Sequence, residues 1–199
     1  MSHRIREAMR TGSFSPPSLS SGSTVVEVDE TYVGRKKGSV KRRGQTHKLC
    51  VLTLVERGGA ARSFHIENAA FRTVFPIMAE NIEREATVVT DEAGQYDPLR
   101  YEFPHHETVN HKAEEWVRGS AHTNTVENYF SIFKRAMKGV YQHCSEKHLH
   151  RYLAEFDFRY SNRSKLGVED ELRAGRALQG IKGRRLTYRA ADRKRAPTG

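Results

Sequence analysis

The chain has 199 residues and carries 34 Lys and Arg residues against 24 Asp and Glu residues, a formal net charge of +10. It contains no run of about 18 apolar residues, which excludes a transmembrane helix, and residues 1–10 lack the apolar block of a signal peptide. Its two cysteines, Cys50 and Cys144, lie in no pair motif, which excludes a disulfide framework and a four-thiolate zinc site. We therefore expect a cytoplasmic protein whose positive charge favours a polyanionic partner, most commonly nucleic acid.

The first residues are separated from the rest of the chain by a polar segment. Residues 3–10 predict the end of a helix, and residues 11–24 are rich in Ser, Gly and Pro, with a single Phe and a single Leu. We therefore expect residues 1–24 to form a remnant helix and a flexible linker.

Three strands are predicted after this linker. Residues 25–33, rich in Val, form the first, and residues 48–55 form a second that is nearly continuous in apolar character and so buried on both faces. A turn at residues 57–59 leads into the third strand, residues 61–66. Between the first two strands, residues 35–43 contain six basic residues and no acidic residue, which predicts an exposed basic turn.

The rest of the chain alternates between helix and strand. Residues 70–82 have helical spacing, in which Pro76 predicts a kink or a later start, and residues 86–90 form another short strand. Helices follow at residues 124–140 and 145–160, and the residues before them have no clear pattern. This order predicts an α/β fold with a central mixed β-sheet flanked by α-helices.

Two acidic residues stand where apolar runs end. Asp29 follows residues 25–28, and Asp91 follows residues 88–90. A carboxylate at the carboxyl edge of a sheet is held rigidly and is accessible to ligands. Aspartates are also common at strand ends as turn formers, so neither position alone distinguishes a site from a turn.

The predicted helix at 124–140 has two different faces. An apolar stripe is formed by Val126, Phe130, Phe133, Met137 and Val140. A polar stripe, either solvated or part of a site, is formed by Asn124, Glu127, Ser131, Lys134 and Lys138. Glu127 and Lys134 lie two helical turns apart on the same face.

Two strand aspartates and a helical glutamate suit divalent cations. Mg²⁺ prefers oxygen ligands and binds through a few carboxylates, phosphate oxygens and water. We therefore predict a site for two Mg²⁺ ions, with Mn²⁺ as a substitute, on Asp29, Asp91 and Glu127. Two such ions, about 3.5–4 Å apart, activate an attacking hydroxyl and stabilise the leaving oxygen of a phosphodiester. Lys134 would lie on the substrate side of the helix, where a phosphate contact is useful.

Several of these segments resemble a known family, the bacterial insertion-sequence transposases with an ISXO-like transposase domain. The resemblance covers roughly Val25 to Arg189 and rests on four strings: residues 26–34 (VEVDETYVG), 90–96 (TDEAGQY), 124–128 (NTVEN) and 152–163 (YLAEFDFRYSNR). Such proteins begin with a zinc ribbon and a helix-turn-helix, of which only residues 2–9 resemble the end. We therefore expect most of that N-terminal region to be missing.

The resemblance implies an RNase-H-like catalytic core of the DDE superfamily. It also implies Mg²⁺-dependent cleavage at transposon ends and joining of the freed 3′-hydroxyl to target DNA. By position, Asp29 is the first catalytic acid and Asp91 the second. Asn124 and Glu127, one helical turn apart, both suit the third position, although spacing and the partner Lys134 favour Glu127 as the metal ligand.

Double-stranded DNA is the partner that this function implies, both as transposon ends and as target. We expect a homo-oligomer on DNA in the bacterial cytoplasm, associated with the nucleoid. The basic turn is either a solvated loop or a contact to the DNA backbone. The candidate phosphate contacts are Lys36, Lys37, Lys41, Arg42, Arg43, Lys134, Arg135 and Lys138. We expect the catalytic domain to cover residues 25–165 and a basic C-terminal extension to cover residues 166–199.

Two other functions are compatible with the same residues. An RNase-H-like nuclease would cleave DNA without joining it. A truncated, inactive remnant would bind DNA through its basic surface and carry out no chemistry.

Overall fold

The computed structural model of the chain describes residues 3–10, 18–19, 24–41, 43–109, 121–142 and 144–182. Its strands are β1 (Val25–Val33), β2 (Leu49–Glu56), β3 (Ala61–Ile66), β4 (Thr87–Asp91) and β5 (His105–Val109). Its α-helices are α1 (His3–Met9), α2 (Phe71–Asn81), α3 (Leu99–Glu102), α4 (Asn124–Ala136), α5 (Leu149–Ser161) and α6 (Asp170–Gln179).

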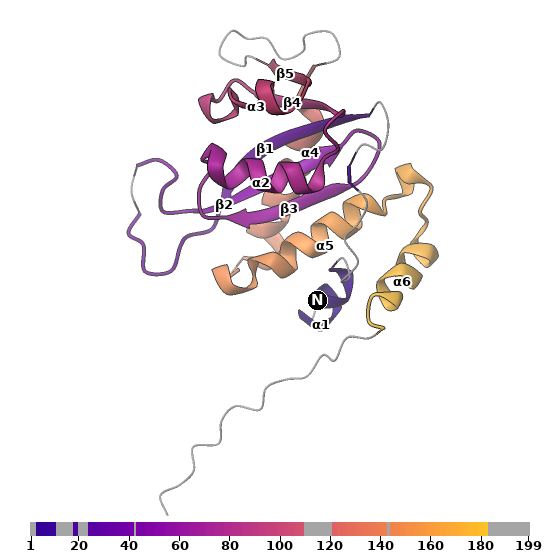
Figure 1. The fold of residues 1–199 in the computed structure, drawn as a ribbon. Helices are drawn as coiled ribbons and strands as arrows, with labels where there is room; N and C mark the ends of the chain where they lie inside the picture. Colours follow the sequence, from indigo (N-terminus) through magenta and orange to yellow (C-terminus); the bar gives the residue numbers. More distant parts are fainter. Residues whose placement is uncertain are drawn as a thin grey trace, which may run out of the picture.

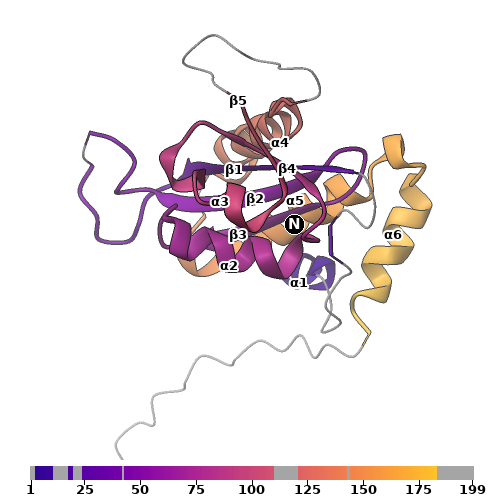
Figure 2. The same cartoon turned by 45° about the horizontal axis from the view of Figure 1, so that its top comes forward.

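The strands form one mixed sheet in the order β3-β2-β1-β4-β5. β1 pairs antiparallel with β2, and β2 with β3, whereas β4 is parallel to both β1 and β5. Helix α2 covers one face of the sheet, and α4 and α5 cover the other (Figures 1 and 2). The predicted α/β fold with a central mixed sheet flanked by helices is confirmed, and it is consistent with an RNase-H-like core.

Two apolar clusters hold the helices on the sheet. Residues of β1 such as Val26 and Val28 pack toward Met78 of α2, whereas Val33 packs toward Phe133 of α4. Alternation along β1 sends successive side chains to opposite faces. Strand β2 is buried from Leu49 to Val55 because both of its faces are covered, as predicted.

Helix α2 runs through Pro76 instead of starting after it. Proline lacks the N–H that would bond to the carbonyl of Arg72, four residues earlier. Both residues are exposed, which makes this position of the helix less costly for a proline than a buried one. The helix therefore begins at Phe71, earlier than a start at the proline would place it.

Several features of the fold were not predicted. β5 and α6 lie in segments without a clear apolar pattern, and α4 ends at Ala136, where a π-helix follows at Met137–Tyr141. The wider π turn changes the phase of the helix. Val140 is therefore 74% exposed, and its predicted place in the apolar stripe is wrong.

The N-terminal segment is partly built into the domain. Helix α1 packs against α5, where Arg6 forms a buried ion pair of 2.8 Å with Glu155. Leu19, expected in a linker, is 2% exposed and forms an isolated bridge with Ile82. Residues 11–17 and 20–23 of that linker, and residues 183–199 of the basic extension, lie outside the described residues. Within the part that is described, no helix has the length and apolar character needed to cross a membrane.

Candidate active site

Asp29 and Asp91 lie on neighbouring parallel strands where the chain changes sides in the sheet. β2 and β3 extend the sheet from one edge of β1, and the chain then crosses over to β4 at the other edge. Ligands of α/β sheets bind at the carboxyl ends of strands at such switch points. The parallel ladder pairs Glu27 with Val89, and the aspartates lie two residues further along their strands. The two carboxylates therefore extend from the same face of adjacent strands.

The local backbone orients both aspartates. The apolar run of residues 25–28 ends just before Asp29. β1 nevertheless continues to Val33 in its pairing with β2, so Asp29 lies inside the strand and not at its end. Its Oδ1 accepts a hydrogen bond of 2.7 Å from the backbone N–H of Glu30. The Oδ1 of Asp91 accepts one of 3.1 Å from the N–H of Ala93, in the turn that ends β4.

The pKa of Asp29 indicates that the predicted acids share one environment. Burial is the largest cause that raises this pKa, from 3.8 to about 8, and the charges of Glu30, Asp91 and Glu127 raise it further. Glu127 belongs to α4, so this helix brings its carboxylate to the same part of the sheet. Asp91 on β4 and Glu127 on α4 are thus close enough for their charges to raise the pKa of Asp29.

Glu30, on the other face of β1, fixes the segment that follows Asp91. Its carboxylate accepts hydrogen bonds from Gln95 Nε2 at 2.8 Å and from the Tyr96 hydroxyl at 2.5 Å, both in the 3-10 helix η1 (Gly94–Tyr96). Burial raises the pKa of Glu30, and the charge of Asp91 adds to this effect, whereas the two hydrogen bonds oppose it. The end of β4 is thereby connected to β1 by side chains as well as by backbone pairing.

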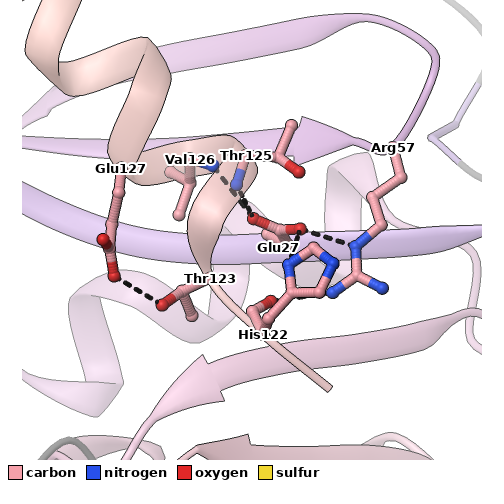
Figure 3. A network of polar contacts seen from close by, with 7 residues as sticks. All are labelled: Glu27, Arg57, His122, Thr123, Thr125, Val126 and Glu127. Carbon is pink, nitrogen blue, oxygen red and sulfur yellow. Dashed lines mark hydrogen bonds and ion pairs between the residues drawn. The ribbon is translucent and has the colours of Figure 1, made fainter. Parts of the chain in front are cut away.

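Glu127 lies in the first turn of α4 and is exposed. Its Oε1 accepts a hydrogen bond of 2.8 Å from the hydroxyl of Thr123, the N-cap residue (Figure 3). An N-cap threonine ordinarily accepts a hydrogen bond from an N–H of the first turn, but here the hydroxyl donates to Glu127. Asn124, the other candidate for the third position, is exposed as the first residue of the helix.

The first-turn N–H groups of α4 are capped instead by Glu27, a residue of β1 that the sequence analysis missed. Its Oε2 accepts hydrogen bonds from the N–H groups of Thr125 at 2.8 Å and Val126 at 2.9 Å. Its Oε1 accepts one of 2.6 Å from Nε of Arg57, and Nδ1 of His122 lies 3.2 Å from the same oxygen (Figure 3). Arg57 also donates to the carbonyl of His122 at 2.8 Å.

The donor set around Asp29 suits a hard divalent cation. Carboxylate oxygens are the ligands that Mg²⁺ prefers. The carboxylates near Asp29 repel one another, and Asp29 therefore binds a proton more readily than usual. A divalent cation could neutralise the same negative charge in place of that proton. Across the described ranges, no three His, Cys, Asp or Glu side chains are gathered as ready ligands of one ion. Asp29, Asp91 and Glu127 thus lie in electrostatic range of one another without forming a complete coordination shell.

A basic cavity of about 740 Å³ lies at the carboxyl end of β1, between the end of α4 and the start of α5. Arg35, Lys134 and Lys138 contribute positive charge to its wall, and Val33 and Leu49 contribute apolar surface. Lys134 lies on the exposed stripe of α4 that also carries Glu127, and Lys138 is exposed in the π-helix that follows α4. The structure therefore joins one end of the basic turn to the polar face of α4.

The other predicted DNA contacts are distributed along the surface. Lys37, Lys41 and Arg43 are exposed in the loop between β1 and β2, whereas Arg42 lies outside the described residues. Lys36 donates to the carbonyl of Glu67 at 3.4 Å. Arg135 is exposed on α4, where it donates to the Ser131 hydroxyl at 3.5 Å.

Comparison with known families identifies the kind of domain. The family model of the ISXO2-like transposase domain matches residues 21–161, which include every element from β1 to α5. No curated protein and no solved structure matches the chain significantly. The matched region is well over half of the sequence and contains Asp29, Asp91 and Glu127. The chain therefore belongs to the ISXO2-like transposase domain family, a family of DNA transposases.

Proposed function

We propose that this chain catalyses Mg²⁺-dependent cleavage at transposon ends and transfer of the 3′-hydroxyl to target DNA. The observation that carries the proposal is the electrostatic influence of Asp91 and Glu127 on Asp29, with the two aspartates on the strands that flank the switch point of the sheet. Family membership favours this reaction over a nuclease that only cleaves and over an inactive DNA-binding remnant. We assign catalysis to residues 25–165, flanked by residues 1–24 and by the basic extension 166–199.

Asp29, Asp91 and Glu127 would hold two Mg²⁺ ions, for which Mn²⁺ can substitute, with Asn124 as the alternative third ligand. When bound, the ions supply Lewis acidity at the attacking hydroxyl and the leaving oxygen. In strand transfer, the 3′-oxygen of the transposon end bonds to a target phosphorus while the bond to the target 3′-oxygen breaks. One proton leaves the attacking hydroxyl, and the leaving oxygen gains one.

The protein's own contribution is positioning. Backbone N–H groups of Glu30 and Ala93 orient the two aspartates, and the Thr123 hydroxyl orients Glu127. Because hydrogen bonds already fix these side chains, few of them need to reorganise when substrate binds.

Double-stranded DNA would cross the site along the exposed face of α4. From Glu127, this face leads to Lys134 and Lys138 and to the basic cavity that they share with Arg35. These cations would neutralise backbone phosphates on either side of the reacting bond. Lys36, Lys37, Lys41, Arg42, Arg43 and Arg135 would extend this contact, and joining two transposon ends would require a homo-oligomer.

Strand transfer of a pre-cut transposon end into plasmid DNA tests the proposal. With Mg²⁺, we expect the wild-type chain to give joined product, and Asp29→Ala and Asp91→Ala each to abolish it. Both variants should retain DNA with wild-type affinity, because neither aspartate is a phosphate contact. Cleavage without joining would support the nuclease instead, and DNA binding without either reaction would support the inactive remnant.

A further inference from the structure

Glu27 is a fully buried carboxylate, 0% exposed, in the middle of a polar network that joins three segments of the chain (Figure 3). Burying an ionised carboxylate is costly unless it is paired and hydrogen-bonded. Here one oxygen accepts from two backbone N–H groups of α4, and the other lies against Arg57 and His122. Both oxygens are thus satisfied by partners on other segments.

The position of Glu27 connects it to the candidate metal site from both ends. Along β1 it is two residues from Asp29 and on the same face of the strand. Through α4 it holds the N–H groups of Thr125 and Val126, the two residues that immediately precede Glu127. One side chain therefore fixes the start of the helix relative to the strand that carries the first acid.

Thr123, the N-cap residue, links the start of the helix to Glu127. Its hydroxyl makes no side-chain capping bond and donates to Oε1 of Glu127. The N–H groups of Thr125 and Val126 are bound by Glu27 instead. Because Glu27 fixes the start of α4, it also fixes the backbone from which Thr123 and Glu127 extend.

We propose that Glu27 is a positioning residue of the metal site, which sets the placement of Glu127 relative to Asp29 by capping α4 from β1. This inference rests on the proposed function, because it takes these two acids to be metal ligands. A purely structural role would make Glu27 important for folding only. The two roles differ in what happens to metal affinity in a variant that still folds.

Glu155 offers a matched control. It is also 0% exposed and ion-paired with an arginine, Arg6, at 2.8 Å. It lies on α5 at the contact with α1. Glu27→Gln and Glu155→Gln each replace one buried, ion-paired carboxylate by an amide of the same size, and only the first belongs to the network at the start of α4.

The test is a titration of the full-length chain with Mn²⁺, in which the free ion is measured by electron paramagnetic resonance. We expect Glu27→Gln to weaken Mn²⁺ binding by about 10–100-fold, the usual effect of removing a group that orients metal ligands. Glu155→Gln should stay within about twofold of wild type. Melting curves are measured first, and the titrations are run at a temperature at which every variant is folded.

One further variant keeps the test informative if Glu27→Gln folds poorly, and a double-mutant cycle adds a test of coupling if it folds. Arg57→Lys retains the charge but lacks the planar fork that serves Glu27 and the His122 carbonyl, so a smaller loss of the same sign is expected. In a double-mutant cycle, Glu27→Gln should add little to Glu127→Gln, because the first acts through the second. Additive losses would contradict this coupling and overturn the inference.

The outcomes separate this inference from the function on which it rests. Equal Mn²⁺ affinities for Glu27→Gln and Glu155→Gln, with a wild-type chain that binds Mn²⁺, would overturn the role of Glu27 alone. A wild-type chain that binds no Mn²⁺ and joins no DNA would overturn both proposals. Weakened binding confined to Glu27→Gln and Arg57→Lys, without additivity, would support both.

Discussion

Glu27 and Asp29 lie two residues apart on the same face of β1, but their carboxylates have opposite electrostatic surroundings. Glu27 is paired with Arg57 and capped onto two N–H groups. Asp29 is half-buried, and this burial, followed by the charges of Glu30, Asp91 and Glu127, raises its pKa to about 8. A single strand thus carries Glu27, whose carboxylate is fully hydrogen-bonded, and Asp29, whose carboxylate lies among like charges. Such a cluster destabilises the metal-free fold, a cost commonly found at functional sites.

The first prediction concerns the pH dependence of stability without divalent cations. The pKa of Asp29 is about 8 in the folded chain and 3.8 ordinarily, so between these values the folded chain retains a proton that the unfolded chain has lost. The stabilising contribution is complete below about pH 4 and is lost as pH rises through 8. Asp29→Asn removes this titration, so it should raise the melting temperature at pH 8.5 more than at pH 5.

Melting curves in EDTA at both pH values check this prediction. For a domain of this size, each 1 kcal/mol corresponds to roughly 2–4 °C in melting temperature. Glu171→Gln, at an exposed position of α6, serves as the control and should have the same small effect at both pH values. An equal shift for Asp29→Asn at pH 5 and pH 8.5 would show that Asp29 does not titrate as described.

The second prediction concerns protons released when a metal binds. At pH 7 Asp29 holds a proton, because its pKa is about 8, and a divalent cation on the ionised carboxylate must displace it. We expect close to one proton released per Asp29 site filled at pH 7, falling toward zero by about pH 9.5. Calorimetric titration with Mn²⁺ in buffers of different ionisation enthalpy gives this number. Asp29→Asn should release none, and a pH-independent proton count in the wild type would contradict the prediction.

The strands and helices could be predicted where apolar residues follow a clear period. β2 is apolar almost throughout, and its burial on both faces followed from that alone. β5, with the sequence HHETV, has one apolar residue and owes its conformation to parallel pairing with β4 at the edge of the sheet. Local pattern contains no information about such an edge strand, because the pairing partner determines it.

The acids of the candidate site could be predicted, but the residues that position them could not. Asp29 and Asp91 follow apolar runs that can be recognised in the sequence. Glu27 depends on Arg57, 30 residues away, and on Thr125, 98 residues away. One signal was present: a glutamate between two valines of a predicted strand must find a partner if that strand is buried. Sequence alone does not identify that partner.

The third prediction concerns the basic cavity as a DNA contact. Lys134 and Lys138 line it together with Arg35, and each phosphate contact contributes to the salt dependence of DNA affinity. Lys134→Ala with Lys138→Ala should weaken binding to a DNA duplex and reduce the slope of log K against log salt by roughly 2. Fluorescence anisotropy between low and moderate salt measures both quantities.

Lys165 supplies the control for this experiment. It is exposed beyond the C-terminal end of α5, whereas the cavity lies at the start of that helix, about 20 Å away along its axis. Lys165→Ala should leave the salt slope close to that of wild type. If both variants lose affinity equally, general positive charge and not the cavity governs binding.

The fourth prediction concerns the ion pair that attaches α1 to α5. Arg6 and Glu155 have side chains only 4% and 0% exposed, and Tyr141 donates a further hydrogen bond of 2.6 Å to Glu155. Arg6→Ala leaves this carboxylate buried without its main partner, which typically costs about 3–5 kcal/mol. Arg10→Ala removes a partly exposed ion pair with Glu7 and should cost about 0–1 kcal/mol. Urea unfolding at pH 7 compares the two.

Because replacing a whole buried pair by apolar groups is often neutral, Arg6→Met combined with Glu155→Leu should recover most of the loss. A double variant as unstable as Arg6→Ala would mean that packing of the arginine between Tyr141 and Tyr152, and not its charge, attaches α1.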